Sequence, residues 1–120
     1  MSNKILIVDD SPDAREMLSM LFDMEGYNVA TAEDGREGLW RASVECPDLI
    51  LTDLQMPNID GTEMIKRLRA EPGSSHTPII VMTAYGDDIA RRAVQSGADR
   101  AVTKPVDYEL LLETVRDLIN

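Results

Sequence analysis

The chain has 120 residues, with 22 Asp and Glu against 12 Lys and Arg, which gives a formal net charge of -10. This length predicts one domain that buries roughly two thirds of the surface of its unfolded form. The negative charge argues against direct binding of nucleic-acid phosphates or anionic lipid heads. We therefore expect residues 1–120 to form a single globular domain with no nucleic-acid partner.

Cysteine content and hydropathy indicate the compartment. The chain has one cysteine, Cys46, so no disulfide can form within it. No charged segment followed by an apolar one opens the sequence, and no apolar run approaches the roughly 18 residues that a membrane span needs. These features predict a cytoplasmic protein without membrane insertion, in which Cys46 is a buried, small hydrophobic residue.

Short apolar runs bounded by Gly, Pro, Asp or Asn predict the strands. Five such runs occur, at residues 5–8, 28–31, 49–52, 79–83 and 101–103. Runs such as LIL and IIVM are apolar without alternation, which is typical of parallel strands that are buried on both faces.

Longer stretches between these runs have apolar residues three or four positions apart, which predicts helices. The first begins with Pro12 after the capping residue Ser11 and stops at Gly26. The other four are expected at residues 33–42, 61–70, 87–96 and 107–120. Alternation of strand and helix implies right-handed crossovers, so we expect a doubly wound α/β fold with a five-stranded parallel sheet covered on both faces.

The spacing of three methionines in the first helix suggests a core position. Met17, Met20 and Met24 recur at three- and four-residue intervals, so most of them are expected in the core.

Polar residues stand at the carboxyl ends of four predicted strands. Asp9 and Asp10 follow the first strand, Asp53 follows the third, Thr83 ends the fourth and Lys104 follows the fifth. Ligands of open parallel sheets bind outside this edge, where the strand order reverses. We therefore expect these side chains to form one site.

Charge repulsion in such a site would be strong. Three carboxylates about 4 Å apart repel by roughly 4 kcal/mol per pair at an effective dielectric constant of 20. Either one of them is protonated, or a hard divalent cation such as magnesium binds between them. Since magnesium binds phosphate oxygens readily, a phosphoryl group is the expected guest.

Four segments, VDD, LILTDLQMPNIDG, IIVMTA and VTKP, resemble in their order the receiver domain of two-component response regulators. The resemblance extends from Lys4 to Ile119. It implies a flavodoxin-like fold with strand order 2-1-3-4-5. It also implies a signalling switch whose Asp53 accepts a phosphoryl group from the phosphohistidine of a histidine kinase or histidine phosphotransfer protein. Such a switch promotes its own phosphorylation and slow dephosphorylation rather than turning over a substrate.

The resemblance also implies a magnesium site. Asp10 and Asp53 would bind the ion together with the backbone carbonyl of Gln55, and Asp9 would assist through water.

Two further residues have roles by the same resemblance. Lys104 would pair with the phosphoryl oxygens, and Thr83 would move to hydrogen-bond one of them. Pro105 would follow a cis peptide bond. Phosphorylation would then change the surface formed by residues 87–120, which would contact a downstream protein.

Two positions depart from the family pattern. Ala101 stands three residues before Lys104, where receivers commonly have Tyr or Phe, so the aromatic half of the usual switch is missing. Tyr85, two residues after Thr83, together with Gln55 flanks the expected path of the attacking water. The bulk of Tyr85 predicts a long-lived phosphoryl group.

Three other functions share some of these sequence features or the same fold. A magnesium phosphohydrolase would also attack with a strand-end Asp, but it typically has a second Asp two residues later, where this chain has Gln55. A flavin or nucleotide binder would need a Gly- or Ser-rich phosphate loop in place of DDSPDA. A constitutive interaction module is compatible with Ala101 but does not explain Asp53, Thr83 and Lys104.

Overall fold

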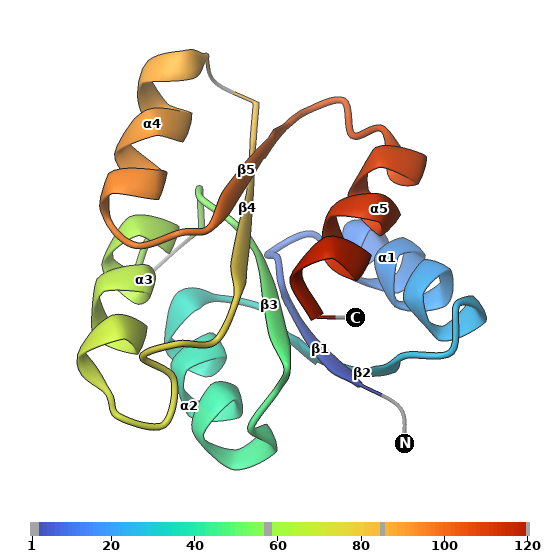
Figure 1. The fold of residues 1–120 in the computed structure, drawn as a ribbon, viewed down its shortest axis with the longest axis horizontal. Coiled ribbons are helices and arrows are strands. Elements are labelled where there is room, and N and C mark those ends of the chain that lie inside the picture. Colours follow the sequence, from blue (N-terminus) through green and yellow to red (C-terminus); the bar gives the residue numbers. More distant parts are fainter. Residues whose placement is uncertain (1–2, 57–58, 85, 120) are drawn as a thin grey trace.

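A computed structural model of the chain describes residues 3–56, 59–84 and 86–119. Strands and helices alternate along it: β1 (Lys4–Val8), α1 (Pro12–Met24), β2 (Asn28–Ala32), α2 (Gly35–Glu45), β3 (Leu49–Asp53), α3 (Gly61–Ala70), β4 (Ile79–Thr83), α4 (Asp87–Gln95), β5 (Arg100–Thr103) and α5 (Tyr108–Ile119) (Figure 1). The five strands form one sheet in the order β2-β1-β3-β4-β5, and every neighbouring pair is parallel. The predicted doubly wound fold and its strand order are confirmed.

The helices cover both faces of the sheet, with α1 and α5 on one side and α2, α3 and α4 on the other (Figure 1). Alternate residues of a strand face opposite layers. In β1, Ile5 and Ile7 belong to the core cluster under α1 and α5, whereas Leu6 and Val8 belong to the cluster under α2, α3 and α4. This double burial explains why the strand sequences are apolar without alternation.

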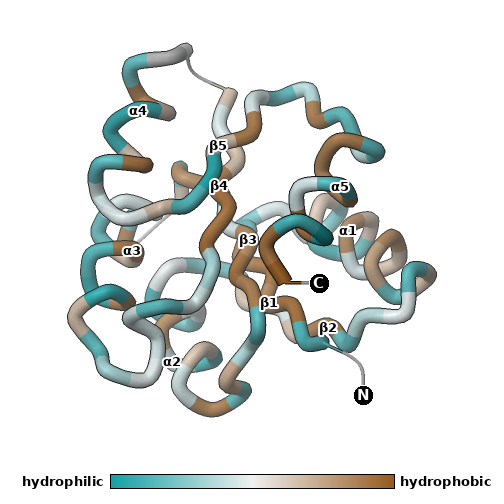
Figure 2. Tube along the Cα trace, viewed as in Figure 1, coloured by the Kyte–Doolittle hydropathy of each residue, from teal (hydrophilic) through white to brown (hydrophobic). Residues whose placement is uncertain are grey.

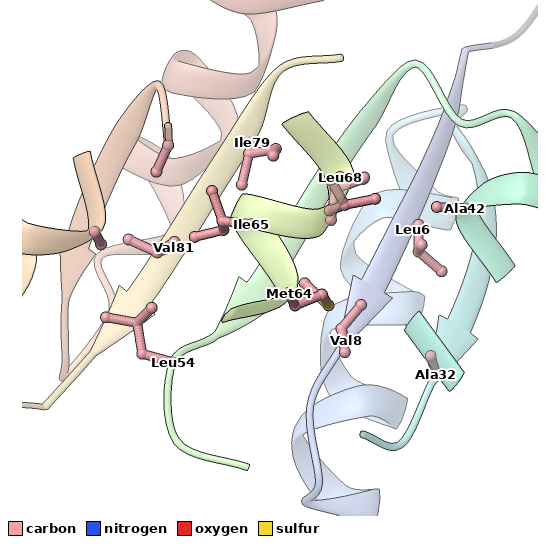
Figure 3. Close-up of a cluster of buried hydrophobic side chains, with 13 residues drawn as sticks. Leu6, Val8, Ala32, Ala42, Leu54, Met64, Ile65, Leu68, Ile79 and Val81 are labelled. Carbon is pink, nitrogen blue, oxygen red and sulfur yellow. The ribbon is translucent and has the colours of Figure 1, made fainter. Parts of the chain in front are cut away.

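The larger cluster is centred on α3. Met64, Ile65 and Leu68 of this helix are at most 2% exposed, and Met64 lies beside Val8 of β1 and Ile65 beside Val81 of β4 (Figure 3). The hydrophobic segments follow the central strands, while much of the loops is hydrophilic (Figure 2). The carboxyl ends of β1, β3 and β4 are thus held by a close-packed core.

Helix α2 differs most from its predicted range. It begins at Gly35 because the side chain of Asp34 caps it, accepting a hydrogen bond from the amide of Glu37 at 2.8 Å. It continues to Glu45, beyond the expected end, and Cys46 ends it in the left-handed conformation with φ 47°.

The expected burial of Cys46 is wrong, since this residue is exposed. A residue that caps a helix end in the left-handed conformation directs the chain away from the helix, so its side chain is not inserted between helix and sheet.

The expected burial of the three α1 methionines is also wrong. Met17, Met20 and Met24 are 46%, 60% and 83% exposed. The face that α1 turns to the sheet is instead formed by Leu18 and Phe22, four residues apart. The helix therefore has a second, solvent-exposed apolar stripe that its spacing alone does not distinguish from the core stripe.

Over the described residues, no helix has both the length and the apolar character that a membrane crossing requires.

Candidate functional site

Asp53 is the last residue of β3, and its carboxylate is almost enclosed, with the residue 7% exposed. Its two oxygens have different partners. Oδ2 lies 3.0 Å from Nζ of Lys104, and Oδ1 accepts a hydrogen bond from the amide of Gln55 at 3.2 Å. Strand β3, the loop after it and the segment after β5 therefore meet at this carboxylate.

Asp9 and Asp10 complete an acidic cluster at the same edge. One carboxylate oxygen from each of Asp9, Asp10 and Asp53 lies within 4.8 Å of the other two. Asp9 is buried, at 2% exposed, whereas Asp10 is exposed. Since β1 and β3 are neighbours in the sheet, their carboxyl ends bring together acids that are more than 40 positions apart in the sequence.

The cluster carries unrelieved negative charge. Burial raises the pKa of Asp9 above its ordinary value, the amide of Ser11 opposes this shift, and repulsion from Asp53 adds to it. Lys104 lowers the pKa of Asp9 and Asp10 raises it, both as smaller effects. The folded protein therefore holds the Asp9 carboxylate at a free-energy cost at neutral pH.

The same carboxylates stabilise the charged form of Lys104. Desolvation disfavours its ammonium, but the hydrogen bond to Asp53 and the attraction of Asp53, Asp9 and Asp10 together outweigh it, so the pKa of Lys104 is raised. Lys104 is thus held in its charged form beside the carboxylates.

The donor set fits a divalent cation. Three carboxylates and one ammonium leave a formal charge of minus two, which a divalent ion cancels. Oxygens on opposite sides of a magnesium ion are about 4 Å apart, because each bond is about 2.0–2.1 Å long. Oxygens on adjacent sides are about 2.9 Å apart, so the carboxylate oxygens, within 4.8 Å of one another, would have to move closer around the ion, or one of them would reach it through a water molecule.

Thr83 and Lys104 stand next to each other across β4 and β5. Thr83, 1% exposed, ends β4, and its carbonyl accepts a hydrogen bond from the amide of Lys104 at 2.8 Å. The Lys104–Pro105 peptide bond is cis, as the family resemblance implied.

Ala101 is partly buried against the core. Tyr85 lies outside the described residues, so its expected effect on hydrolysis stays a prediction.

A cavity of about 520 Å³ opens beside the cluster, between α1 and the segment from Lys104 to Tyr108. Its apolar wall includes Met17, and the hydroxyl of Tyr108 donates a weak hydrogen bond to Sδ of Met17 at 3.6 Å. A groove of about 620 Å³ between α2 and α3 contains none of the acids of the cluster. The cavity wall was not expected, since nothing in the sequence pairs Met17 with Tyr108.

A second contact that the sequence did not suggest joins α1 to the backbone of the acidic pair. Arg15, on the first turn of α1, donates a hydrogen bond from Nη1 to the backbone carbonyl of Asp9 at 2.7 Å. The only available signal was its place shortly after the acidic pair.

Residues 5–116 match the response regulator receiver domain family. The chain belongs to this family. The receiver domain is 34% identical to the chemotaxis response regulator CheY4 of Vibrio cholerae, whose solved structure superposes with a TM-score of 0.92 over 98% of this chain and 99% of that one.

Larger regulators also resemble this receiver domain. It is 40% identical to the DNA-binding dual master transcriptional regulator RpaA of Synechocystis sp., over 97% of this chain and 48% of that protein. It is 38% identical to the response regulator PleD of Caulobacter vibrioides, over 98% of this chain and 26% of that protein. The chain thus spans about half or less of the length of these two curated relatives.

Family membership identifies the general role. Receiver domains are the phosphorylation-regulated switch domains of two-component signalling.

Proposed function

We propose that this receiver domain accepts a phosphoryl group on Asp53 and reports it to a protein partner. The observation that carries the proposal is the pairing of Asp53 with Lys104 at 3.0 Å inside a cluster of three acids. A nearly buried carboxylate with an adjacent cation is suited to attack phosphorus, because phosphoryl transfer depends on positioning and charge neutralisation more than on proton chemistry.

The transfer step follows from these contacts. An oxygen of Asp53 forms a bond to the phosphorus of a phosphohistidine as the N–P bond breaks, and the electron pair of that bond returns to the imidazole, which is then protonated. Lys104 neutralises charge on the transferring oxygens. The amide of Gln55, which donates to Oδ1 of Asp53, holds the carboxylate in a fixed orientation during attack.

The metal ligands would be Asp10, Asp53 and the backbone carbonyl of Gln55, with Asp9 acting through water. Magnesium bound there supplies positive charge that the phosphoryl oxygens need in the transition state. Burial is the main cause of the raised pKa of Asp9, and repulsion from Asp53 adds to it although Lys104 opposes it; a cation bound at the cluster would reduce this cost.

Switching would begin at Thr83. A phosphoaspartate is more negative than the carboxylate it replaces, so the Thr83 hydroxyl is drawn toward it. Because Thr83 leads into α4, this movement biases the surface of α4, β5 and α5. Ala101 cannot add a rotamer change, so backbone movement carries the signal.

The proposal extends to the domain boundaries, the compartment and the partners of the protein. We expect one receiver domain over residues 1–120 in the cytoplasm, phosphorylated by a histidine kinase or histidine phosphotransfer protein. No direct nucleic-acid contact of this domain is expected at a net charge of -10.

Intact mass after incubation with magnesium and a small acyl phosphate tests the function. We expect one added phosphoryl group per molecule, lost in Asp53→Ala and on chelation of the metal. Asp23→Ala, which removes an exposed carboxylate of α1, is the matched control and should be labelled like wild type. Labelling of Asp53→Ala would contradict the assignment. Release of many phosphates per molecule would favour the magnesium phosphohydrolase instead.

A further inference from the structure

Asp9 is held by three hydrogen bonds that involve both its backbone and its side chain. Its amide donates to the carbonyl of Ala32 at 3.1 Å, and its Oδ1 accepts from the amide of Ser11 at 2.9 Å. Its carbonyl accepts from Nη1 of Arg15 at 2.7 Å. The last bond is short and charge-assisted, the stronger class of hydrogen bond.

These bonds also determine where Asp10 stands. A peptide group is planar, so the direction of the Asp9 carbonyl sets the position of the Asp10 Cα atom. The next peptide group, on the other side of Asp10, is held through the Ser11 amide. Both peptide groups that flank Asp10 are thus fixed, and Arg15 holds the first of them.

Arg15 is itself anchored by the start of α1. The Ser11 side chain caps the helix by accepting from the amide of Ala14 at 3.2 Å, and the amide of Arg15 donates to the Ser11 carbonyl at 3.0 Å. The guanidinium therefore reaches back from an ordered helical turn to the end of β1.

We propose that Arg15 is a positioning residue for the metal-binding carboxylate of Asp10. Asp10 is exposed, so its place beside Asp53 depends strongly on the backbone that Arg15 holds. The inference rests on the magnesium site of the proposed function. Residues that orient metal ligands typically change metal affinity by about 10- to 100-fold when they are removed.

Coulomb attraction alone predicts the opposite sign. Removing a positive charge near an acidic cluster should tighten the binding of a cation, because one repulsive interaction disappears. Loss of positioning should weaken binding. The direction of the change in magnesium affinity therefore separates the two effects.

Isothermal titration calorimetry with magnesium chloride tests the proposal on the full chain. Arg15→Met keeps most of the aliphatic stem and removes every donor, and we expect its magnesium Kd to rise about 10-fold or more. Arg15→Gln, whose shorter side chain does not reach the Asp9 carbonyl, carries the same expectation if Arg15→Met does not fold. Arg36→Met is the matched control, since Arg36 is exposed on the first turn of α2, and its Kd should equal that of wild type or fall slightly.

A second measurement separates positioning from a general loss of stability. In the phosphorylation of Arg15→Met by a small acyl phosphate, the magnesium concentration for half-maximal rate should rise as the Kd does, and saturating magnesium should restore most of the rate. Equal or tighter magnesium binding by the Arg15 variants would overturn the inference and leave the proposed function intact. Absence of magnesium binding by wild type would overturn the proposed metal site itself.

Discussion

Asp9 is where the chemistry of the site opposes the stability of the fold. The residue is 2% exposed, and burial is the largest of the effects that raise its pKa. A buried carboxylate near two others is destabilising unless a cation compensates it. Lys104, which forms an ion pair with Asp53, compensates part of the negative charge of the cluster. The remaining cost is what makes the cluster receptive to a metal ion.

Replacing Asp9 by asparagine should therefore stabilise the metal-free protein at neutral pH. Because the pKa of Asp9 is raised in the folded state, this state retains a proton that the unfolded state has already lost as pH rises above about 3.8. Stability from this group falls as pH rises through the folded pKa, and the full cost is present above it. Asparagine avoids the cost and can still accept the Ser11 hydrogen bond. We therefore expect the free energy of unfolding at about pH 7 to rise, because a buried charge has been removed.

Urea unfolding in the presence of a chelator, from about pH 4 to about pH 7, measures this effect. The advantage of Asp9→Asn should shrink toward acid pH, because the wild-type carboxyl becomes protonated in both states. Asp23→Asn, at an exposed position of α1, should show no such trend. A variant less stable than wild type across the whole range would mean that the buried charge is fully compensated without metal.

Among the elements, those with a single dominant apolar pattern were predicted best. Helix α3 has the predicted bounds, since Gly61 and the cap at Asp60 define its start and its apolar stripe faces one core cluster. Helix α1 was predicted in position but not in orientation, because it has two apolar stripes and only tertiary packing selects Leu18 and Phe22. Periodicity identifies a helix, but it cannot say which of two apolar faces is buried.

The α3–β4 connection is stabilised by one side chain. Arg69 donates to the carbonyls of Gly97, Ser74, Ser75 and Thr77 at 2.7–3.2 Å. It also pairs with Asp99 at 2.9 Å, whose carboxylate in turn accepts from the amide that begins β4. The C-terminal end of α3 is therefore joined to the loops that begin β4 and β5. Residue type and spacing do not predict this network, since it depends on where two loops meet.

Arg69→Met should destabilise the domain by about 3 kcal/mol, because hydrogen bonds to charged groups contribute about 1.5–3 kcal/mol each and several carbonyls lose their donor. Arg67→Met, on the same helix, removes only an exposed pair with Glu63 at 3.9 Å and should change stability by less than about 0.5 kcal/mol. Chemical unfolding compares the two. Hydrogen exchange should increase in residues 71–78 of the first variant, and equal stability of both variants would rule out the network as a major support.

For the molecule as a whole, parallel topology explains how much of the site could be foreseen. The carboxyl ends of β1, β3, β4 and β5 lie at one edge, so strand-end residues Asp9, Asp53, Thr83 and Lys104 had to be close once the strands were recognised. The bond from Arg15 to the Asp9 carbonyl could not be foreseen in the same way. It depends on the side-chain conformation in the first turn of α1, which neither residue type nor spacing specifies.

Stability of the whole domain should respond to magnesium, because an ion that binds only the folded state stabilises it by mass action. At a free concentration 100 times the Kd the gain is about 2.7 kcal/mol. For a domain of this size that corresponds to a rise in Tm of roughly 10 °C. Calorimetric melting with and without magnesium chloride measures the rise, with sodium chloride at equal ionic strength as the control for screening. Asp10→Asn should lose most of the magnesium-specific rise while still folding, since Asp10 is exposed. An equal rise in wild type and Asp10→Asn would place the ion away from this cluster.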